Sequence, residues 1–129
     1  MHRTSMPGQL TAWITLALTL LFATGPAGAA PNAATEQTIR QLIAHVAGSD
    51  LTFVRNAREH TPRQAAEHME KKYRHFRDDI DTAEDFIRLC ATKSLLSGKP
   101  YRVIDRSGKR MPTADWLRAE LAARQADRP

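Results

Sequence analysis

Apolar residues recur through much of the chain at helical spacing, and shorter stretches between them have the pattern of paired strands. The first helical stripe runs from residue 39 to residue 46 and ends at Gly48, a residue type that readily closes a helix. Its apolar members, at i, i+3, i+4 and i+7, are Ile39, Leu42, Ile43 and Val46. Residues 51–55 (LTFVR) then predict a strand, and residues 58–60 predict a return strand after a turn at Asn56-Ala57.

A second helix has a clear start at Thr61-Pro62-Arg63-Gln64. The threonine hydroxyl can cap the helix, proline suits the first helical position, and the glutamine side chain can reach back to the cap. Its predicted inner stripe is Ala65, Ala66, Met69, Tyr73, Phe76 and Ile80. A third helix begins in the same way at Thr82-Ala83-Glu84-Asp85, and we expect Phe86, Ile87 and Cys90 to face inward from it.

The end of the third helix and the second hairpin follow from glycine and proline positions. The helix cannot pass Lys99, because Gly98 is a natural helix end and the proline after Lys99 lacks the amide proton that a helix needs. Residues 101–105 alternate like a strand, Ser107-Gly108 supplies a turn, and residues 109–111 return. We therefore expect a second β-hairpin after the third helix.

Thr113 is predicted to cap a last helix, followed at residues 122–129 by a polar tail that we expect to fray. The inward residues of this helix are Trp116, Leu117 and Leu121. The predicted order is α-β-β-α-α-β-β-α. Because four helices and two hairpins cannot bury their apolar faces separately, we expect a mostly helical α+β fold with a small antiparallel sheet built from the two hairpins. Residues 36–121 then form a single compact domain, preceded by a short lead at residues 30–35.

The first 29 residues differ in kind from the rest. A basic start with Arg3 precedes an uncharged apolar run at residues 10–23, followed by Pro26 and the small-residue pattern Ala27-Gly28-Ala29. This order is typical of a signal peptide, so we expect cleavage after Ala29 and a location in the periplasm or outside the cell. An uncleaved membrane anchor is the alternative, but an anchor needs about 20 apolar residues and this run is shorter. We expect no stable membrane span after cleavage.

Charge narrows the class of partner. The whole chain has 19 Lys and Arg residues against 14 Asp and Glu residues, and removal of the leader takes away only Arg3. The basic residues are dispersed along the sequence rather than clustered, which argues against a nucleic-acid-binding protein. Outside the cytoplasm, a modest positive charge is better suited to an anionic component of the cell envelope or to another periplasmic protein.

Cys90 is the one cysteine of the chain, so no intramolecular disulfide can form. The domain must therefore be held together by its apolar core. Cys90 falls among apolar residues at helical spacing, which favours a buried and inert thiol over a reactive one.

Several segments together resemble the YfeK-like family of small exported bacterial proteins of unknown function. These segments are Phe53-Val54-Arg55-Asn56, Ala65-Ala66-Glu67-His68-Met69 with Lys72, Asp81-Thr82-Ala83-Glu84-Asp85-Phe86-Ile87, and Ser94-Leu95-Leu96-Ser97-Gly98-Lys99-Pro100-Tyr101. The resemblance implies a location outside the cytoplasm and implies no known reaction. One departure is Ala57, where the family pattern has glycine. A type I′ turn needs positive φ at both central residues, so this alanine leaves the turn type open.

Familiar ligand motifs are incomplete. Ser97-Gly98-Lys99 lacks the earlier glycine and the following Ser or Thr of a phosphate-binding loop. His68 and His75 lie two helical turns apart, about 10 Å along the axis, whereas zinc ligands on one helix are normally one turn apart. Together with His60, these histidines are better interpreted as solvated side chains. The sequence therefore predicts no metal site and no cofactor.

The candidate site with most support combines Arg55, His68, Lys72 and Lys99. His68 and Lys72 are i, i+4 neighbours on one helix face, and all four side chains could converge on an anion. The alternative is that Arg55 and Lys99 are merely exposed ends of a strand and a helix, while Lys72 lies along the edge of the core.

The absence of a complete catalytic motif favours a non-catalytic binding or accessory domain over an enzyme. The competing interpretation is a small cell-envelope hydrolase or transferase that uses His68 with Ser94 or Ser97. This interpretation requires one of the two serine hydroxyls to lie within hydrogen-bond reach of His68 inside a cleft.

Overall fold

The computed structural model describes residues 30–129, so the predicted signal peptide and its cleavage site lie outside the described residues. The helices are α1 (Ala33–Ala47), α2 (Pro62–Phe76), the short 3₁₀ helix η1 (Arg77–Asp79), α3 (Ala83–Cys90) and α4 (Thr113–Ala126). The strands are β1 (Thr52–Arg55), β2 (Arg58–His60), β3 (Arg102–Ile104) and β4 (Arg110–Pro112). The predicted α+β class and element order are confirmed. In residues 30–129, no helix combines the length and apolar character that crossing a bilayer requires.

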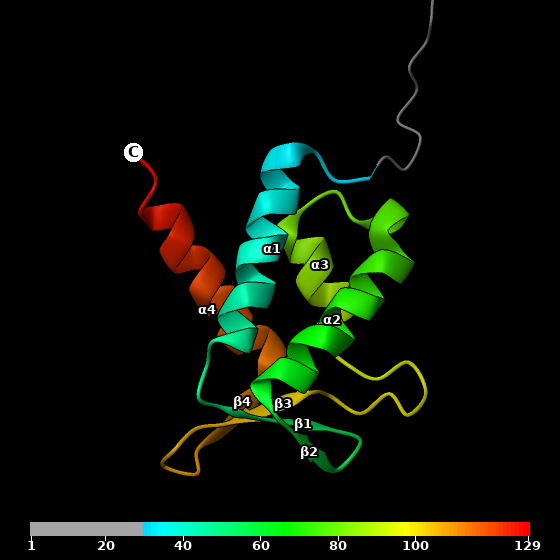
Figure 1. Ribbon diagram of the computed structural model, residues 1–129, viewed down its shortest axis with the longest axis vertical. Helices are drawn as coiled ribbons and strands as arrows, with labels where there is room; N and C mark the ends of the chain where they lie inside the picture. Colours follow the sequence, from blue (N-terminus) through cyan, green and yellow to red (C-terminus); the bar gives the residue numbers. More distant parts are fainter. Residues whose placement is uncertain (1–29) are drawn as a thin grey trace, which may run out of the picture.

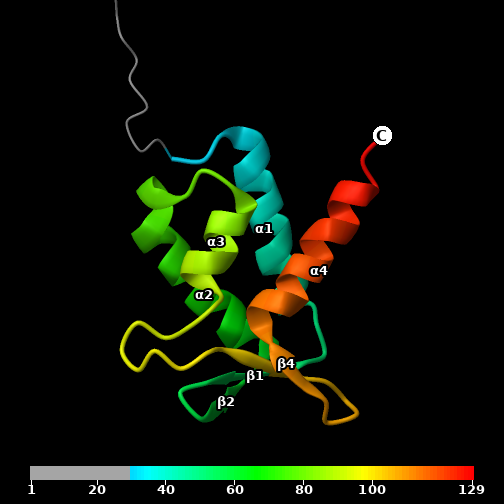
Figure 2. The same ribbon diagram turned by 180° about the vertical axis from the view of Figure 1, so that it is seen from behind.

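The two hairpins join into one antiparallel sheet in the order β2-β1-β3-β4. Strand β1 pairs with β3 in the register Phe53↔Val103, and Val103 in turn pairs with Met111 of β4. All four α-helices lie on the same side of this sheet, which forms one end of the molecule (Figures 1 and 2). No helix of residues 30–129 lies against the opposite face of the sheet, so this part of the chain forms two layers.

The apolar core lies between the helices and the inner face of the sheet. Its largest fully buried members are Phe86, Ile39, Leu42, Ile80, Ile87 and Leu117. Phe53 and Val103 are also buried, whereas their neighbours Val54 and Arg102 are half-buried and exposed, respectively. This alternation is what a sheet with one covered face requires. All helices, strands and core residues of the described segment fall between residues 33 and 126.

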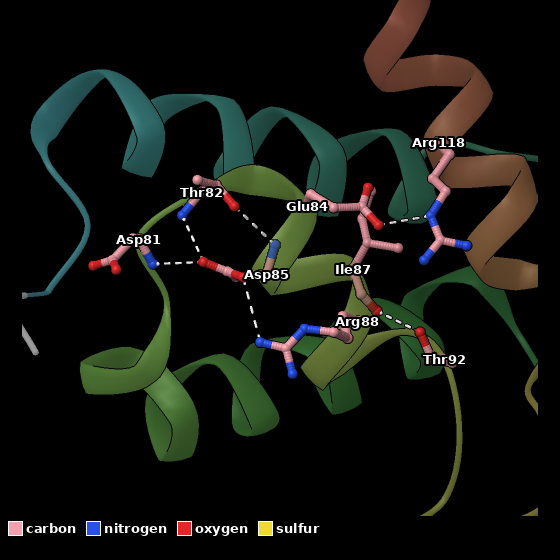
Figure 3. Close-up of polar contacts among 8 residues, drawn as sticks. All are labelled: Asp81, Thr82, Glu84, Asp85, Ile87, Arg88, Thr92 and Arg118. Atoms are coloured by element: carbon pink, nitrogen blue, oxygen red, sulfur yellow. Dashed lines mark hydrogen bonds and ion pairs between the residues drawn. The ribbon is translucent and has the colours of Figure 1, made fainter.

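The predicted starts of α2 and α3 are both confirmed as capping boxes. At α2, the Thr61 hydroxyl accepts from the Gln64 amide, and the Gln64 side chain accepts from the Thr61 amide. At α3, the Asp85 carboxylate accepts from the amides of Asp81 and Thr82, each at 3.1 Å (Figure 3). These bonds satisfy amides that the first helical turn leaves without partners.

Helix α3 is shorter than the glycine and proline positions allow. It ends at Cys90, and the Ile87 carbonyl accepts both from the Ala91 amide at 3.0 Å and from the Thr92 hydroxyl at 2.8 Å (Figure 3). The last carbonyls of a helix lack further amide donors, and here a hydroxyl just past the helix supplies one more bond. Gly98 therefore ends no helix. Its φ of +70° serves a tight turn within the segment 91–101, in which its amide donates to the Ser94 carbonyl.

Both ends of the domain extend further than the sequence predicts. Helix α1 begins at Ala33 within the predicted lead, because the Asn32 side chain caps it by accepting from the Thr35 amide at 2.9 Å. At the other end, α4 continues to Ala126, through most of the predicted polar tail. The Arg124 guanidinium lies 2.8 Å from the Glu120 carboxylate, one helical turn back, which supports this extension.

The predicted cap of α4 is wrong. Pro112 occupies the capping position, and Thr113 is the first residue of the helix. The Thr113 amide donates to the Tyr101 carbonyl at 3.0 Å, so the threonine is held by the end of the loop before β3. Its hydroxyl is fully buried and has no hydrogen-bond partner within residues 30–129. A backbone hydrogen bond to a neighbouring segment thus takes the place of the predicted side-chain cap.

The turn between β1 and β2 has the type I′ signature despite its alanine. Asn56 and Ala57 have φ values of 52° and 62°, so both central residues are left-handed. Such a conformation costs a residue with a Cβ about 1–2 kcal/mol. The pairing of Arg55 with Arg58 keeps the two strands in register across this turn. Strand pairing therefore imposes a backbone conformation that alanine disfavours.

Candidate functional site

A buried tyrosine joins the two predicted site residues of α2. The His68 Nε2 atom and the Lys72 Nζ atom each lie 3.2 Å from the Tyr101 hydroxyl oxygen. Helical geometry places His68 and Lys72 on one face, and the segment that leads into β3 brings Tyr101 against that face. Lys72 also donates to the Lys93 carbonyl at 3.0 Å. The result is a connected Lys72–Tyr101–His68 chain.

Lys72 is unusual among these residues because its side chain is buried and yet forms no ion pair with a carboxylate among residues 30–129. The residue is only 7% exposed, and no ion pair joins it to an acid in residues 30–129. Burial lowers its pKa from the ordinary lysine value, because desolvation disfavours the charged form. A buried lysine normally has a paired charge. The α2 face therefore contains positive charge that the described part of the protein does not neutralise.

His68 is neutral at physiological pH. Burial, followed by the positive charges of Arg55 and Lys72, lowers its pKa to about 4. Burial also raises the pKa of Tyr101, so the phenol keeps its proton. Since an ammonium group can only donate, the Tyr101 oxygen accepts from Lys72 and its O–H donates to His68 Nε2. This assignment leaves the imidazole proton on Nδ1, where it can donate to a ligand.

A polar cleft of about 330 Å³ lies beside His68. Its lining residues are Arg55, His60, Gln64, Glu67, His68 and Lys71. The one carboxylate among them, Glu67, lies 3.7 Å from the Arg63 guanidinium. Arg55 and Lys71 form no ion pair with an acid in the described part of the chain. We call this feature the basic cleft.

The structure brings together three of the four predicted site residues. Arg55 lines the basic cleft beside His68, and Lys72 is linked to His68 through Tyr101. Lys99 instead lies in the irregular segment 91–101, and no hydrogen bond or ion pair of its side chain connects it with the others among residues 30–129. Lys99 is thus neither the end of a helix nor a lining residue of this cleft.

Sequence reasoning missed Tyr101, His60 and Lys71. Lys71 follows His68 by three residues on α2, so helical spacing alone could have placed it near the site. His60 is the last residue of β2, and α2, η1 and α3 all separate it from Tyr101 along the chain, so no local pattern connects the two. Only the pairing of β1 with both β2 and β3 brings the chain segments of these residues to one side of α2.

Comparisons with known proteins identify the family. Residues 33–125 match the model of a family described as "Family of unknown function (DUF5329)". The chain belongs to this family. It is also 42% identical over 89 residues to the uncharacterized protein YfeK of Salmonella typhimurium strain LT2, an alignment that covers 68% of this chain and 74% of that protein. The predicted YfeK-like relationship is confirmed, and no solved structure matches the chain.

In this DUF5329 member the two serines proposed as nucleophiles serve the loop between α3 and β3. The Ser94 oxygen accepts from the amides of Leu96 and Ser97, at 3.3 and 3.4 Å. The Ser97 hydroxyl donates to the side-chain oxygen of Asn56 in the β1–β2 turn. His68 bonds to Tyr101 instead. In the described residues, therefore, neither serine is paired with His68 as the hydrolase or transferase interpretation requires.

The other chemically reactive side chains of the described DUF5329 domain lie in surroundings that suit a structural role. Cys90 is fully buried, and burial raises the pKa of its thiol to about 12, as expected for an inert cysteine. Among residues 30–129, no three side chains of the metal-ligating types come together as a candidate metal centre. Arg55, His68 and Lys71, which line the basic cleft, offer hydrogen-bond donors and positive charge.

Proposed function

We propose that the protein is exported and acts outside the cytoplasm as a non-catalytic binding domain that recognises an anionic component of the cell envelope through the basic cleft. One observation carries the binding part of this proposal. Arg55 and Lys71 line the cleft without ion-pair partners in the described residues, and the buried charge of Lys72 lies behind His68. A phosphate or carboxylate would supply the missing negative charge.

The donors around the cleft suit an oxyanion. Arg55 has a planar fork of N–H groups that matches phosphate or carboxylate oxygens, and Lys71 adds a flexible ammonium. His68 remains neutral because its pKa is about 4, yet it presents an N–H through Nδ1. Bonds from charged donors to an anion are stronger than neutral ones, typically about 1.5–3 kcal/mol each. Lys72 and Tyr101 hold the imidazole in place rather than contacting the ligand.

The binding proposal is tested by titrating residues 30–129 with inorganic phosphate and following backbone amide and histidine NMR signals. We expect saturable shifts at Arg55, His68 and Lys71. Replacing Arg55 with alanine should weaken phosphate binding about tenfold, because one charge-assisted contact is lost. The matched control is Arg74→Ala, which removes the same charge from an exposed position on α2 outside the cleft. Equal affinity in the Arg55→Ala variant and the wild type would contradict the proposal.

The export part rests on the leader-like pattern of residues 1–29. Its test is independent of ligand binding. When the complete chain is produced in a Gram-negative host, the osmotic-shock fraction should contain a form whose intact mass corresponds to a start at Ala30. Retention of the full-length chain in the cytoplasm or the membrane fraction would contradict it.

A further inference from the structure

The segment between α3 and β3 holds two leucines out in solvent. Leu95 is 66% exposed and Leu96 is 97% exposed, and they are the large apolar residues that stand out on the surface of the described chain. The segment is nevertheless well anchored. A bridge pairs Lys93 with Pro100, and the Ser97 side chain bonds to Asn56 in the β1–β2 turn. The leucines are therefore presented by a braced loop rather than by a loose one.

Charge is strongly segregated along the molecule. We define the sheet end as residues 52–60 and 93–112, which comprise the four strands, their two turns and the leucine loop. The sheet end contains eight basic and two acidic residues, whereas residues 33–47, 62–90 and 113–126 contain nine basic and ten acidic ones. Of the eight basic side chains, Arg106 pairs with Asp50 at 2.7 Å, and no other has an ion-pair partner in residues 30–129.

The leucine loop and the sheet face that no helix of residues 30–129 covers lie at the same end of the described domain. The loop extends beside the β1–β2 turn in both views, away from the helices (Figures 1 and 2). Phe53, Val103 and their partner Met111 face the helices, so the alternate residues Arg102 and Arg110 belong to the outer face. Both arginines are exposed. The end thus combines a broad positive surface with one projecting apolar tip.

From this combination we infer that the sheet end docks on an anionic lipid surface, with Leu95 and Leu96 inserted among the acyl chains. Lys93 and Lys99 flank the leucines and would lie at the level of the headgroups, a position that long basic side chains favour at membranes. A protein partner fits the leucine loop less well, because the basic residues that flank the leucines are lysines, which are depleted in protein interfaces. The inference does not depend on the basic cleft, since Leu95, Leu96, Arg102 and Arg110 do not line it, although Arg55 and His60 belong to both the cleft and the sheet end.

The test measures co-sedimentation of residues 30–129 with vesicles of phosphatidylcholine alone and of phosphatidylcholine mixed with phosphatidylglycerol. We expect binding to the mixed vesicles, little binding to phosphatidylcholine alone, and loss of binding at high salt because the charges are screened. The double variant Leu95→Ser/Leu96→Ser should bind the mixed vesicles about tenfold or more weakly, since each leucine loses its apolar transfer energy. Because both side chains are solvent-exposed, this variant should fold normally, which circular dichroism checks.

A pair of charge variants distinguishes attraction by the sheet end from an effect of the net charge of the protein. Arg102→Ser/Arg110→Ser should weaken binding to the mixed vesicles about tenfold, because each basic residue near an anionic bilayer contributes to the attraction. The control Arg40→Ser/Arg74→Ser removes the same charge from exposed helical positions and should leave binding unchanged.

Three results would overturn the inference. These are no binding to the mixed vesicles, equal binding to both kinds of vesicle, and binding that the serine variant leaves unaffected. Concentration-dependent dimerisation that the serine variant abolishes, without vesicle binding, would assign the loop to a second copy of the chain instead. Phosphate binding in the cleft should be the same in the serine variant and the wild type. A failure of vesicle docking is therefore distinguishable from a failure of the proposed anion site.

Discussion

Replacing Phe86 with alanine is expected to lower the free energy of unfolding by about 3–5 kcal/mol. Phe86 is fully buried on α3, and its ring packs edge-to-face on Tyr73 of α2, with ring centroids 5.9 Å apart. Truncation removes the buried ring and leaves a cavity between two helices. The chain has a single cysteine, so no intramolecular disulfide can compensate. Because small domains are typically stable by only about 5–15 kcal/mol, this loss is a large fraction of the total.

Urea unfolding of residues 30–129, followed by circular dichroism, measures the effect. The matched control is Phe76→Ala, since Phe76 is only partly buried and packs at the edge of the core. We expect the control to cost clearly less than Phe86→Ala. A similar loss for both variants would mean that the centre of the core does not lie where α3 meets α2.

Lowering the pH from about 6.5 to about 4 is expected to destabilise the protein by about 2 kcal/mol through His68. Burial and the charges of Arg55 and Lys72 lower the pKa of His68 to about 4, while the unfolded chain keeps the ordinary value of 6.5. Between these values the unfolded state binds more protons than the folded state. The stability is therefore fully present above pH 6.5 and is lost as the pH falls through the folded pKa. The value of about 2 kcal/mol is smaller than the full pKa shift would give, because the imidazole is partly exposed to solvent.

The variant His68→Gln isolates this contribution, because glutamine can still accept from the Tyr101 hydroxyl but does not titrate. Thermal unfolding measured between pH 7 and pH 4 should show a smaller loss of stability in the variant than in the wild type. His75→Gln is the matched control, since His75 is exposed on the same helix. His60, whose pKa is also lowered by burial, titrates in the wild type and in both variants. Parallel pH profiles for the wild type and His68→Gln would contradict the assignment.

The low pKa of His68 also constrains how the basic cleft works. At neutral pH the positive charge at the cleft comes from Arg55, Lys71 and Lys72, while His68 contributes an uncharged donor. A bound anion would favour protonation of His68, because an opposite charge nearby raises the pKa of an imidazole. Anion binding and the acid stability of the domain are thus linked through one side chain.

Local sequence patterns predicted the structure correctly where interactions between neighbouring residues decide it. The starts of α2 and α3 follow from capping boxes whose partners are three residues apart, as at Thr61 and Gln64. The shared face of His68 and Lys72 follows from the geometry of a single helix. The predictions failed at the end of α3 and at the start of α4. The hydroxyl of Thr92 accompanies the early end of α3, and the Tyr101 carbonyl holds the amide of Thr113.

The sequence by itself thus determined the order of helices and hairpins and the pairing of His68 with Lys72 on one helix face, because each depends on residues that are close along the chain. Only the tertiary structure decided that Tyr101 lies between His68 and Lys72, that Arg55 lines the cleft and that Lys99 does not. These relations depend on how β1 and β3 pair beneath α2. The burial that shifts the pKa values of His68 and Lys72 is likewise a property of the packed molecule, since desolvation arises only when distant segments exclude water.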